Sequence, residues 1–212
     1  MKRHRFTLAP MLAPVLAAAA GLSLAGSFAQ GSVVNFDVFP GGGVVPNNTV
    51  IGSQYSSLGV LFSSTAPGGP TAGSFTGEAS SAPNFLVGIA PGSGAGLFPI
   101  QMDFTVAGIT SVSLNALSVG TGNFTATAYA ADLFTVLDTV SFTNGPGAGN
   151  GFGNINAVTL NGAGIARVVT SIAQTQLIVD GFGLDDVSFV PSPGAAALLG
   201  LGGLMAMRRR RV

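Results

Sequence analysis

The sequence predicts an all-β protein: a single antiparallel β-sandwich of jelly-roll type, flanked by an N-terminal signal helix and a short C-terminal membrane helix. Apolar and polar residues alternate over short stretches, as on half-buried strands. Loops rich in glycine and proline separate these stretches, and residues 30–190 contain no sustained helical stripe with capping signals. About nine strands joined by such loops favour a jelly roll. A chain of 212 residues suits one all-β domain.

The strands follow one another along the chain. Residues 98–106 alternate without error, with apolar side chains at even numbers, so Phe104 is expected in the core and Thr105 on the opposite face. Val, Thr, Phe and Ser dominate the stretches, as is typical of strands. The predicted strands are residues 34–38, 59–62, 98–106, 112–119, 124–130, 134–142, 155–160, 165–172 and 177–190.

Turns and irregularities are predicted from glycine, proline and breaks in the alternation. The alternation slips at Ala116/Leu117 and at Ala157/Val158, which predicts two β-bulges. Gly162–Gly164 is expected to form a hairpin turn. The predicted loops are residues 40–43, 66–74, 90–96 and 144–154.

Charge is segregated between the termini and the middle of the chain. Of eight basic residues, only Arg167 lies between residues 30 and 190, whereas all eight acids lie there, so this segment carries 1 − 8 = −7. Because no basic patch exists outside the termini, the composition excludes a nucleic-acid-binding protein. The chain has no cysteine, so core packing, backbone pairing or a bound ion must stabilise the fold.

The N-terminus has the pattern of a secretory signal. Met1–Arg5 is a basic region, residues 8–24 are apolar, and small residues precede the bond between Ala29 and Gln30, where signal peptidase is expected to cleave. Residues 1–29 are therefore predicted to be a signal peptide and residues 30–189 the exported β-sandwich. The alternative is an N-terminal membrane anchor.

The C-terminus, residues 190–212, combines a proline pair, a short apolar run and an arginine cluster. As a helix, the 13 residues from Ala195 to Met207 would extend about 20 Å, shorter than a hydrocarbon core of about 30 Å, and the basic cluster would stay on the cytoplasmic side. The sorting-motif residues are Val190, Pro191, Ser192, Pro193, Gly194, Arg208, Arg209, Arg210 and Arg211.

This tail resembles that of bacterial PEP-CTERM proteins, and the resemblance covers Val190 to Val212. It implies recognition by exosortase, a membrane protease-transpeptidase. Ser192 replaces the glutamate usual between the two prolines of that family. The alternative is a plain C-terminal membrane anchor. Residues 51–62 and 181–189 also resemble segments of the jelly-roll domains that PEP-CTERM proteins often carry.

The exported segment lacks the residues of most active sites. It contains no His, Cys, Lys or Trp, which excludes Ser–His–Asp and Cys–His catalysis and a histidine zinc site. A carboxylate pair of the glycosidase type remains chemically open, with Asp103, Asp132 and Asp138 as candidates. We expect Asp103 to face solvent. Asp138 falls on the apolar phase of its strand, which an edge strand or a bulge would explain.

The densest acidic cluster is Asp180, Asp185 and Asp186. With Asp37 as a cross-strand partner, these carboxylates could hold a hard cation such as Ca²⁺. The alternative is a solvated acidic turn, which we favour, and no metal or cofactor is assigned.

These observations predict a non-catalytic exported bacterial protein, sorted through its tail and deposited at the cell surface or in extracellular matrix. Its expected partners are signal peptidase, an exosortase-type protease and the membrane. The alternative is a polysaccharide-binding β-sandwich module, with or without structural calcium. Tyr55 and Tyr129 are the only tyrosines, so aromatic stacking platforms for sugars are scarce.

Overall fold

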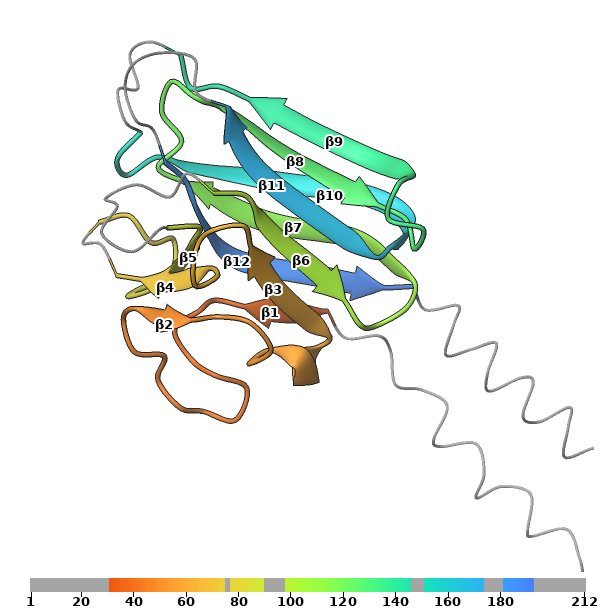
Figure 1. Ribbon diagram of the computed structural model, residues 1–212, viewed down its shortest axis with the longest axis horizontal. Coiled ribbons are helices and arrows are strands. Elements are labelled where there is room, and N and C mark those ends of the chain that lie inside the picture. Colours follow the sequence, from red (N-terminus) through yellow and green to blue (C-terminus); the bar gives the residue numbers. More distant parts are fainter. Residues whose placement is uncertain (1–30, 75–76, 90–97, 146–150, 174–180, 193–212) are drawn as a thin grey trace, which may run out of the picture. The chain divides into compact units, whose positions relative to one another are not determined.

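Two antiparallel sheets form the structure, which is a computed structural model that describes residues 31–74, 77–89, 98–145, 151–173 and 181–192. The all-β prediction is confirmed, since the described residues form strands, loops and one 3₁₀ turn, η1 (Ser56–Leu58). In Figure 1 the five-stranded sheet lies in front of the seven-stranded sheet. Within these ranges, no helix has the length and apolar character needed to cross a membrane. The predicted signal peptide and the membrane helix lie outside the described residues.

The seven-stranded sheet is organised around the last strand. That strand pairs with the first strand of the chain, so that Ser32 lies opposite Phe189 and Val34 opposite Val187. The order is β10 (Ile155–Ile165), β7 (Ile109–Leu117), β12 (Gly183–Pro191), β5 (Phe85–Val87), β4 (Thr71–Gly73) and β2 (Thr49–Val50), and β1 (Ser32–Val34) also pairs with β12.

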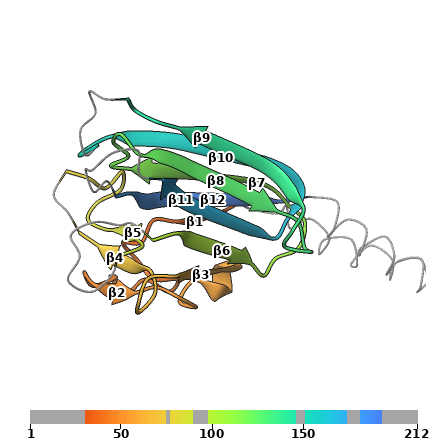
Figure 2. The same cartoon turned by 45° about the horizontal axis from the view of Figure 1, so that its top comes forward.

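The five-stranded sheet supplies the second layer. Its order is β3 (Val60–Ser64), β6 (Ile100–Phe104), β11 (Arg167–Ala173), β8 (Asn123–Tyr129) and β9 (Val136–Phe142). At the edge of the sandwich, β9 of this sheet lies beside β10 of the other, as Figure 2 shows.

The core lies between the inner faces of the two sheets, because alternate side chains of each strand point inward. Ile100, Met102 and Phe124 are fully buried, and the Phe124 ring lies 5.2 Å from Phe142 and 5.4 Å from Phe182, between centroids. Phe104 has the expected inward phase but is only half-buried, because it ends β6. Its ring still packs against Phe189 of β12, with a centroid distance of 5.0 Å.

Several short elements differ from the sequence prediction. The predicted loop 66–74 contains β4, and β2 and β5 were missed as well. These strands have two or three residues, too few to show alternation, and all three residues of β5 are buried. The predicted strand 34–38 ends early, because β1 stops at Val34 and Phe36 turns into the left-handed region with φ 59°.

Both predicted bulges are wrong. The β7–β10 register runs without interruption from Leu117 opposite Ile155 to Leu114 opposite Val158. Ala116 and Leu117 are both buried because Leu117 packs on the other face of the sheet, in a small cluster with Phe85 and Val87.

The actual irregularities lie elsewhere. Register shifts occur at Ala128/Tyr129 between β8 and β9, and at Asp185/Ser188 and Val190/Pro191 between β12 and β7. A fourth shift, between Asn161 and Ile165, falls inside β10. Gly162–Gly164 is therefore part of a strand and not the predicted hairpin turn.

We expect Phe124→Ala to lower the free energy of unfolding by about 3–5 kcal/mol, because it removes a fully buried ring from contact with two other rings. Thr105→Ala, at an exposed position, should change it by less than about 0.5 kcal/mol. Urea denaturation of both variants measures the difference. Equal losses at the two positions would contradict the placement of the core.

Candidate functional site

The outer face of the five-stranded sheet carries a row of functional side chains. Because Met102, Val168 and Ala128 point into the core, their neighbours in sequence point outward. The register places Asp103 of β6 opposite Arg167 of β11, and Arg167 opposite Tyr129 of β8. Three side chains of different chemistry thus lie side by side across three adjacent strands.

An ion pair is at the centre of this row. The Arg167 Nε donates to Asp103 Oδ1 at 2.6 Å, and the two side chains are 26% and 32% exposed. Gln101, two residues along β6, donates from Nε2 to Asp103 Oδ2 at 2.7 Å. The expected solvent-facing Asp103 is therefore a half-exposed, paired carboxylate. Such a pair stabilises a fold by about 0–1 kcal/mol, so its main effect is to orient the guanidinium.

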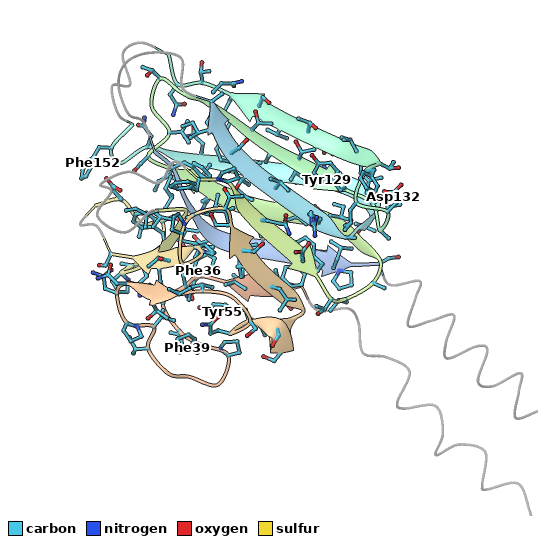
Figure 3. The ribbon with its side chains drawn as sticks, in the orientation of Figure 1. Phe36, Phe39, Tyr55, Tyr129, Asp132 and Phe152 are labelled. Carbon is cyan, nitrogen blue, oxygen red and sulfur yellow. The ribbon has the colours of Figure 1, made fainter. Side chains whose placement is uncertain are left out.

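Tyr129 adds an aromatic ring beside the guanidinium. It is half-buried and ends β8, close to the turn that holds Asp132, as Figure 3 shows. Threonine and serine continue the outer face along β8 and β9, where the hydroxyls of Thr125 and Ser141 lie 3.0 Å apart. Among the described residues, the result is a mostly polar face with one ring, one guanidinium, one carboxylate and several hydroxyls, and with Leu61 and Val169 as apolar neighbours.

The three candidate carboxylates of a glycosidase pair do not converge. Asp138 lies on edge strand β9 next to the bulge, and its Oδ2 accepts the backbone N–H of Asn161 in β10 at 2.8 Å. Both explanations offered for its apolar phase are confirmed. Asp132 accepts the backbone N–H of Thr135 at 2.9 Å within its own turn. Asp103 lies on the outer face, so each carboxylate serves a separate structural contact.

The acidic cluster near the C-terminus is a buried structural contact. Asp185 is fully buried, and its Oδ2 accepts the Ser81 backbone N–H at 2.7 Å and the Ser80 hydroxyl at 2.9 Å. Burial raises the pKa of Asp185 to about 6. The favoured expectation of a solvated turn is wrong for this residue, which lies inside β12 and ties the segment before β5 to it.

Asp186 shares the Ser80 hydroxyl with Asp185, whereas Asp37 makes a separate contact. Asp186 Oδ2 accepts the Ser80 hydroxyl at 2.8 Å, whereas Asp37 Oδ1 accepts the Asn84 backbone N–H at 2.7 Å. Asp180 lies outside the described residues. Among the described residues, no three His, Cys, Asp or Glu side chains gather closely enough to hold a metal ion.

The predicted sorting motif begins inside the last strand. Val190 and Pro191 end β12, with Pro191 opposite Ile109, and the Ser192 N–H donates to the Gly108 carbonyl at 2.6 Å. The rest of the predicted site residues (Ala29, Gln30, Pro193, Gly194, Arg208, Arg209, Arg210 and Arg211) lie outside the described residues.

Sequence reasoning missed the partners that give these carboxylates their roles. Arg167 stood out as the only basic residue between positions 30 and 190, which was a signal that it pairs with an acid. Ser80 and Ser81 carried no comparable signal, because they precede Asp185 by 105 and 104 residues in the chain.

No protein-family model and no curated protein matches this sequence. Several solved structures resemble it, with low TM-scores. They include a carbohydrate-binding module of family 29 (9% identity, 78% of this chain and 93% of that chain, TM-score 0.36). A K1 cleaved adhesin domain of Lys-gingipain from Porphyromonas gingivalis W83 is similar at 16% identity (77% and 99% covered, TM-score 0.39). The isomalto-dextranase of Arthrobacter globiformis T6 is similar at 15% identity (76% and 32% covered, TM-score 0.37).

The raised pKa of Asp185 predicts a pH dependence of stability. Its folded pKa of about 6 exceeds the ordinary 3.8, so this group stabilises the fold fully below about pH 4 and that contribution is lost as the pH rises through 6. At pH 7 the loss amounts to about 3 kcal/mol. Denaturation curves between pH 4.5 and 7.5 should therefore show the free energy of unfolding falling with pH, and Asp185→Asn should flatten this slope.

Two comparisons isolate this effect. Burial also raises the pKa of Glu78, so part of the wild-type slope will remain in Asp185→Asn. Asp132→Asn is the control, because hydrogen bonds from Thr135 lower the pKa of Asp132 and keep its titration below this pH range. An unchanged slope in Asp185→Asn would contradict the buried position of the carboxylate.

Proposed function

We propose that the exported domain is a non-catalytic binding module, a sandwich of jelly-roll type that holds a polysaccharide on the outer face of its five-stranded sheet. The observation that carries this proposal is the row formed by Asp103, Arg167 and Tyr129, with Gln101 beside it. Sugars present an apolar ring face and a rim of hydroxyls. An aromatic ring next to fixed donors and acceptors matches both features.

The ion pair prepares the guanidinium for such a ligand. Asp103 engages the Nε of Arg167, and the terminal nitrogens of the planar fork suit the oxygens of neighbouring sugar hydroxyls. Asp103 adds a carboxylate opposite Arg167, and Gln101, two residues along β6, adds an amide that donates to this carboxylate. Because these groups already contact one another, little side-chain freedom is lost when a ligand binds.

Charge and dimensions favour a neutral polymer. The segment 30–190 carries eight acids against one arginine, so an acidic polysaccharide would be repelled. Five strands at about 4.8 Å spacing give a face about 19 Å wide, which accommodates several sugar units and not a single one. Because Tyr129 is the one aromatic side chain of the row, moderate affinity is favoured at each site, raised by repeated contacts along the polymer.

Export and sorting form the second part of the proposal. The N-terminal pattern supports cleavage by signal peptidase between Ala29 and Gln30, and the resemblance of the tail to PEP-CTERM proteins supports recognition by an exosortase-type protease. A module delivered to the envelope in this way would meet polysaccharide at the cell surface or in extracellular matrix.

Tyr129→Ala should weaken binding to a neutral polysaccharide at least tenfold, because the stacking surface is lost. Arg167→Lys should also weaken it, since a lysine keeps the charge but lacks the planar fork. A glycan array identifies the polymer, and affinity electrophoresis in gels that contain it measures the change.

Phe152→Ala is the matched aromatic control, because Phe152 is exposed in the loop before β10, away from the row. It should bind as the unaltered protein does. If no neutral polysaccharide on the array is bound, or if Phe152→Ala loses as much affinity as Tyr129→Ala, the face is not the binding site.

Replacing Arg208–Arg211 by serine should abolish envelope retention and processing together, because the positive cluster orients the apolar run in the membrane. Replacement by lysine keeps the charge and should preserve both. Cell fractionation and the mass of the mature chain report the outcome. An unchanged location and mass in the serine variant would rule out the sorting role of the tail.

A further inference from the structure

The turn between β8 and β9 presents two large apolar side chains to solvent. Phe134 is 88% exposed and Leu133 39% exposed, and Val136, at the start of β9, is 53% exposed. Isolated apolar residues are common on protein surfaces, but adjacent ones at the tip of a hairpin form a protruding apolar surface. We call Leu133 and Phe134 the apolar tip.

The turn holds the apolar tip in one conformation. Asp132 Oδ1 accepts the backbone N–H groups of Phe134 at 3.1 Å and Thr135 at 2.9 Å. The turn closes with hydrogen bonds from Ala130 N to Thr135 O and from Leu133 N to Ala130 O, both 2.9 Å. Leu133 adopts φ 62°, a left-handed conformation that is unfavourable for a residue other than glycine. The turn thus fixes two apolar side chains outward in a strained backbone.

The apolar tip lies at the end of the sandwich from which the chain leaves β12. The pairing shows this directly, because Tyr129, just before the turn, lies opposite Arg167, and Ile165 lies opposite Ile109, which in turn lies opposite Pro191. Figures 1 and 2 both show the β8–β9 turn at the same end as the last residues of β12. Val106, in the turn before β7, is a further exposed apolar residue at this end.

Only a short stretch of chain separates this end from the apolar run. Ser192 is hydrogen-bonded to Gly108, and only Pro193 and Gly194 stand between it and the run from Ala195 to Met207. Two residues span about 7 Å at full extension. Insertion of the run into a bilayer would therefore bring this end of the sandwich to the lipid surface.

We propose that the apolar tip inserts into the interfacial region of the lipid bilayer that the C-terminal tail engages. This inference rests on the proposed membrane engagement of the tail. A protein partner fits less well, because the apolar tip consists of two side chains, whereas a stable protein interface buries roughly 1,200–2,000 Å². Apolar side chains at the headgroup boundary enter about 5–10 Å and need no complementary partner surface.

The absence of tryptophan from the chain allows a direct test. Phe134→Trp introduces a single tryptophan at the apolar tip of the mature protein, residues 30–212, reconstituted in phosphatidylcholine vesicles. We expect its emission to be blue-shifted and to be quenched at least twofold by brominated phosphatidylcholine. Flotation of the vesicles on a density gradient separately reports whether the tail holds the protein on the membrane.

Phe152→Trp is the matched control. Phe152 is exposed in the loop before β10, whose first residue Ile155 pairs with Leu117 at the opposite end of β7. Its emission should stay typical of water and resist the lipid quencher. Circular dichroism checks that both variants keep the β-rich fold.

Each outcome separates the two proposals. Flotation together with quenching at position 134 and not at position 152 supports insertion of the apolar tip. Flotation without quenching at position 134 overturns the insertion while leaving the tail anchor intact, and equal quenching at both positions overturns it too. Failure to float removes the anchor and the inference with it.

Discussion

Strand β12 is the element on which the seven-stranded sheet depends, because one of its edges serves two partners in succession. Gly183 and Leu184 pair with β5, and the stretch from Val187 to Phe189 pairs with β1, while β7 occupies the other edge. Asp185 and Asp186 lie where the partner changes. There the buried carboxylate of Asp185 accepts the Ser81 N–H, so a side chain supplies the acceptor that a neighbouring strand would otherwise provide. The carboxylate remains in the core because the backbone needs that acceptor, and its raised pKa reflects the cost of burial.

The pairing of β12 with distant segments also explains which parts of the fold could be predicted from the sequence. Strands such as β6 and β8 alternate over several residues, and that periodicity is a local property of the chain. Strand β5 has only three residues, all buried, and exists because β12 and β4 lie on either side of it. Asp185 looked like a member of an acidic cluster because its neighbours in sequence are acids, whereas its contacts come from a segment far away in the chain. Pairings between distant segments leave no pattern in a single sequence.

The outer face of the five-stranded sheet shows the converse relation between sequence and site. The alternation of β6 predicted that Asp103 points outward, and Arg167 is the only basic residue between positions 30 and 190. No local pattern, however, predicted that the two side chains pair. Only the antiparallel register of β6, β11 and β8 brings carboxylate, guanidinium and ring into one row. With only two tyrosines in the chain, the sequence predicted few stacking platforms for sugars. Tyr129 is a candidate platform because of the groups around it. One ring beside fixed polar groups can orient a sugar that a lone ring would bind weakly.

Both proposals involve the hairpin of β8 and β9, and its geometry assigns them to different surfaces. Tyr129 points outward from the sheet face, whereas Leu133 and Phe134 lie beyond the strand ends, in the turn closed by Asp132. If the turn meets the bilayer, the strands of the sheet would run away from the membrane, and the outer face would be roughly perpendicular to the membrane plane. The row of Asp103, Arg167 and Tyr129 would then lie close above the lipid surface, where a polymer could run along the membrane and cross the strands of several neighbouring molecules. If the run from Ala195 enters the bilayer, the two residues before it, Pro193 and Gly194, suit that arrangement, because a long flexible linker would leave the orientation of the face undefined.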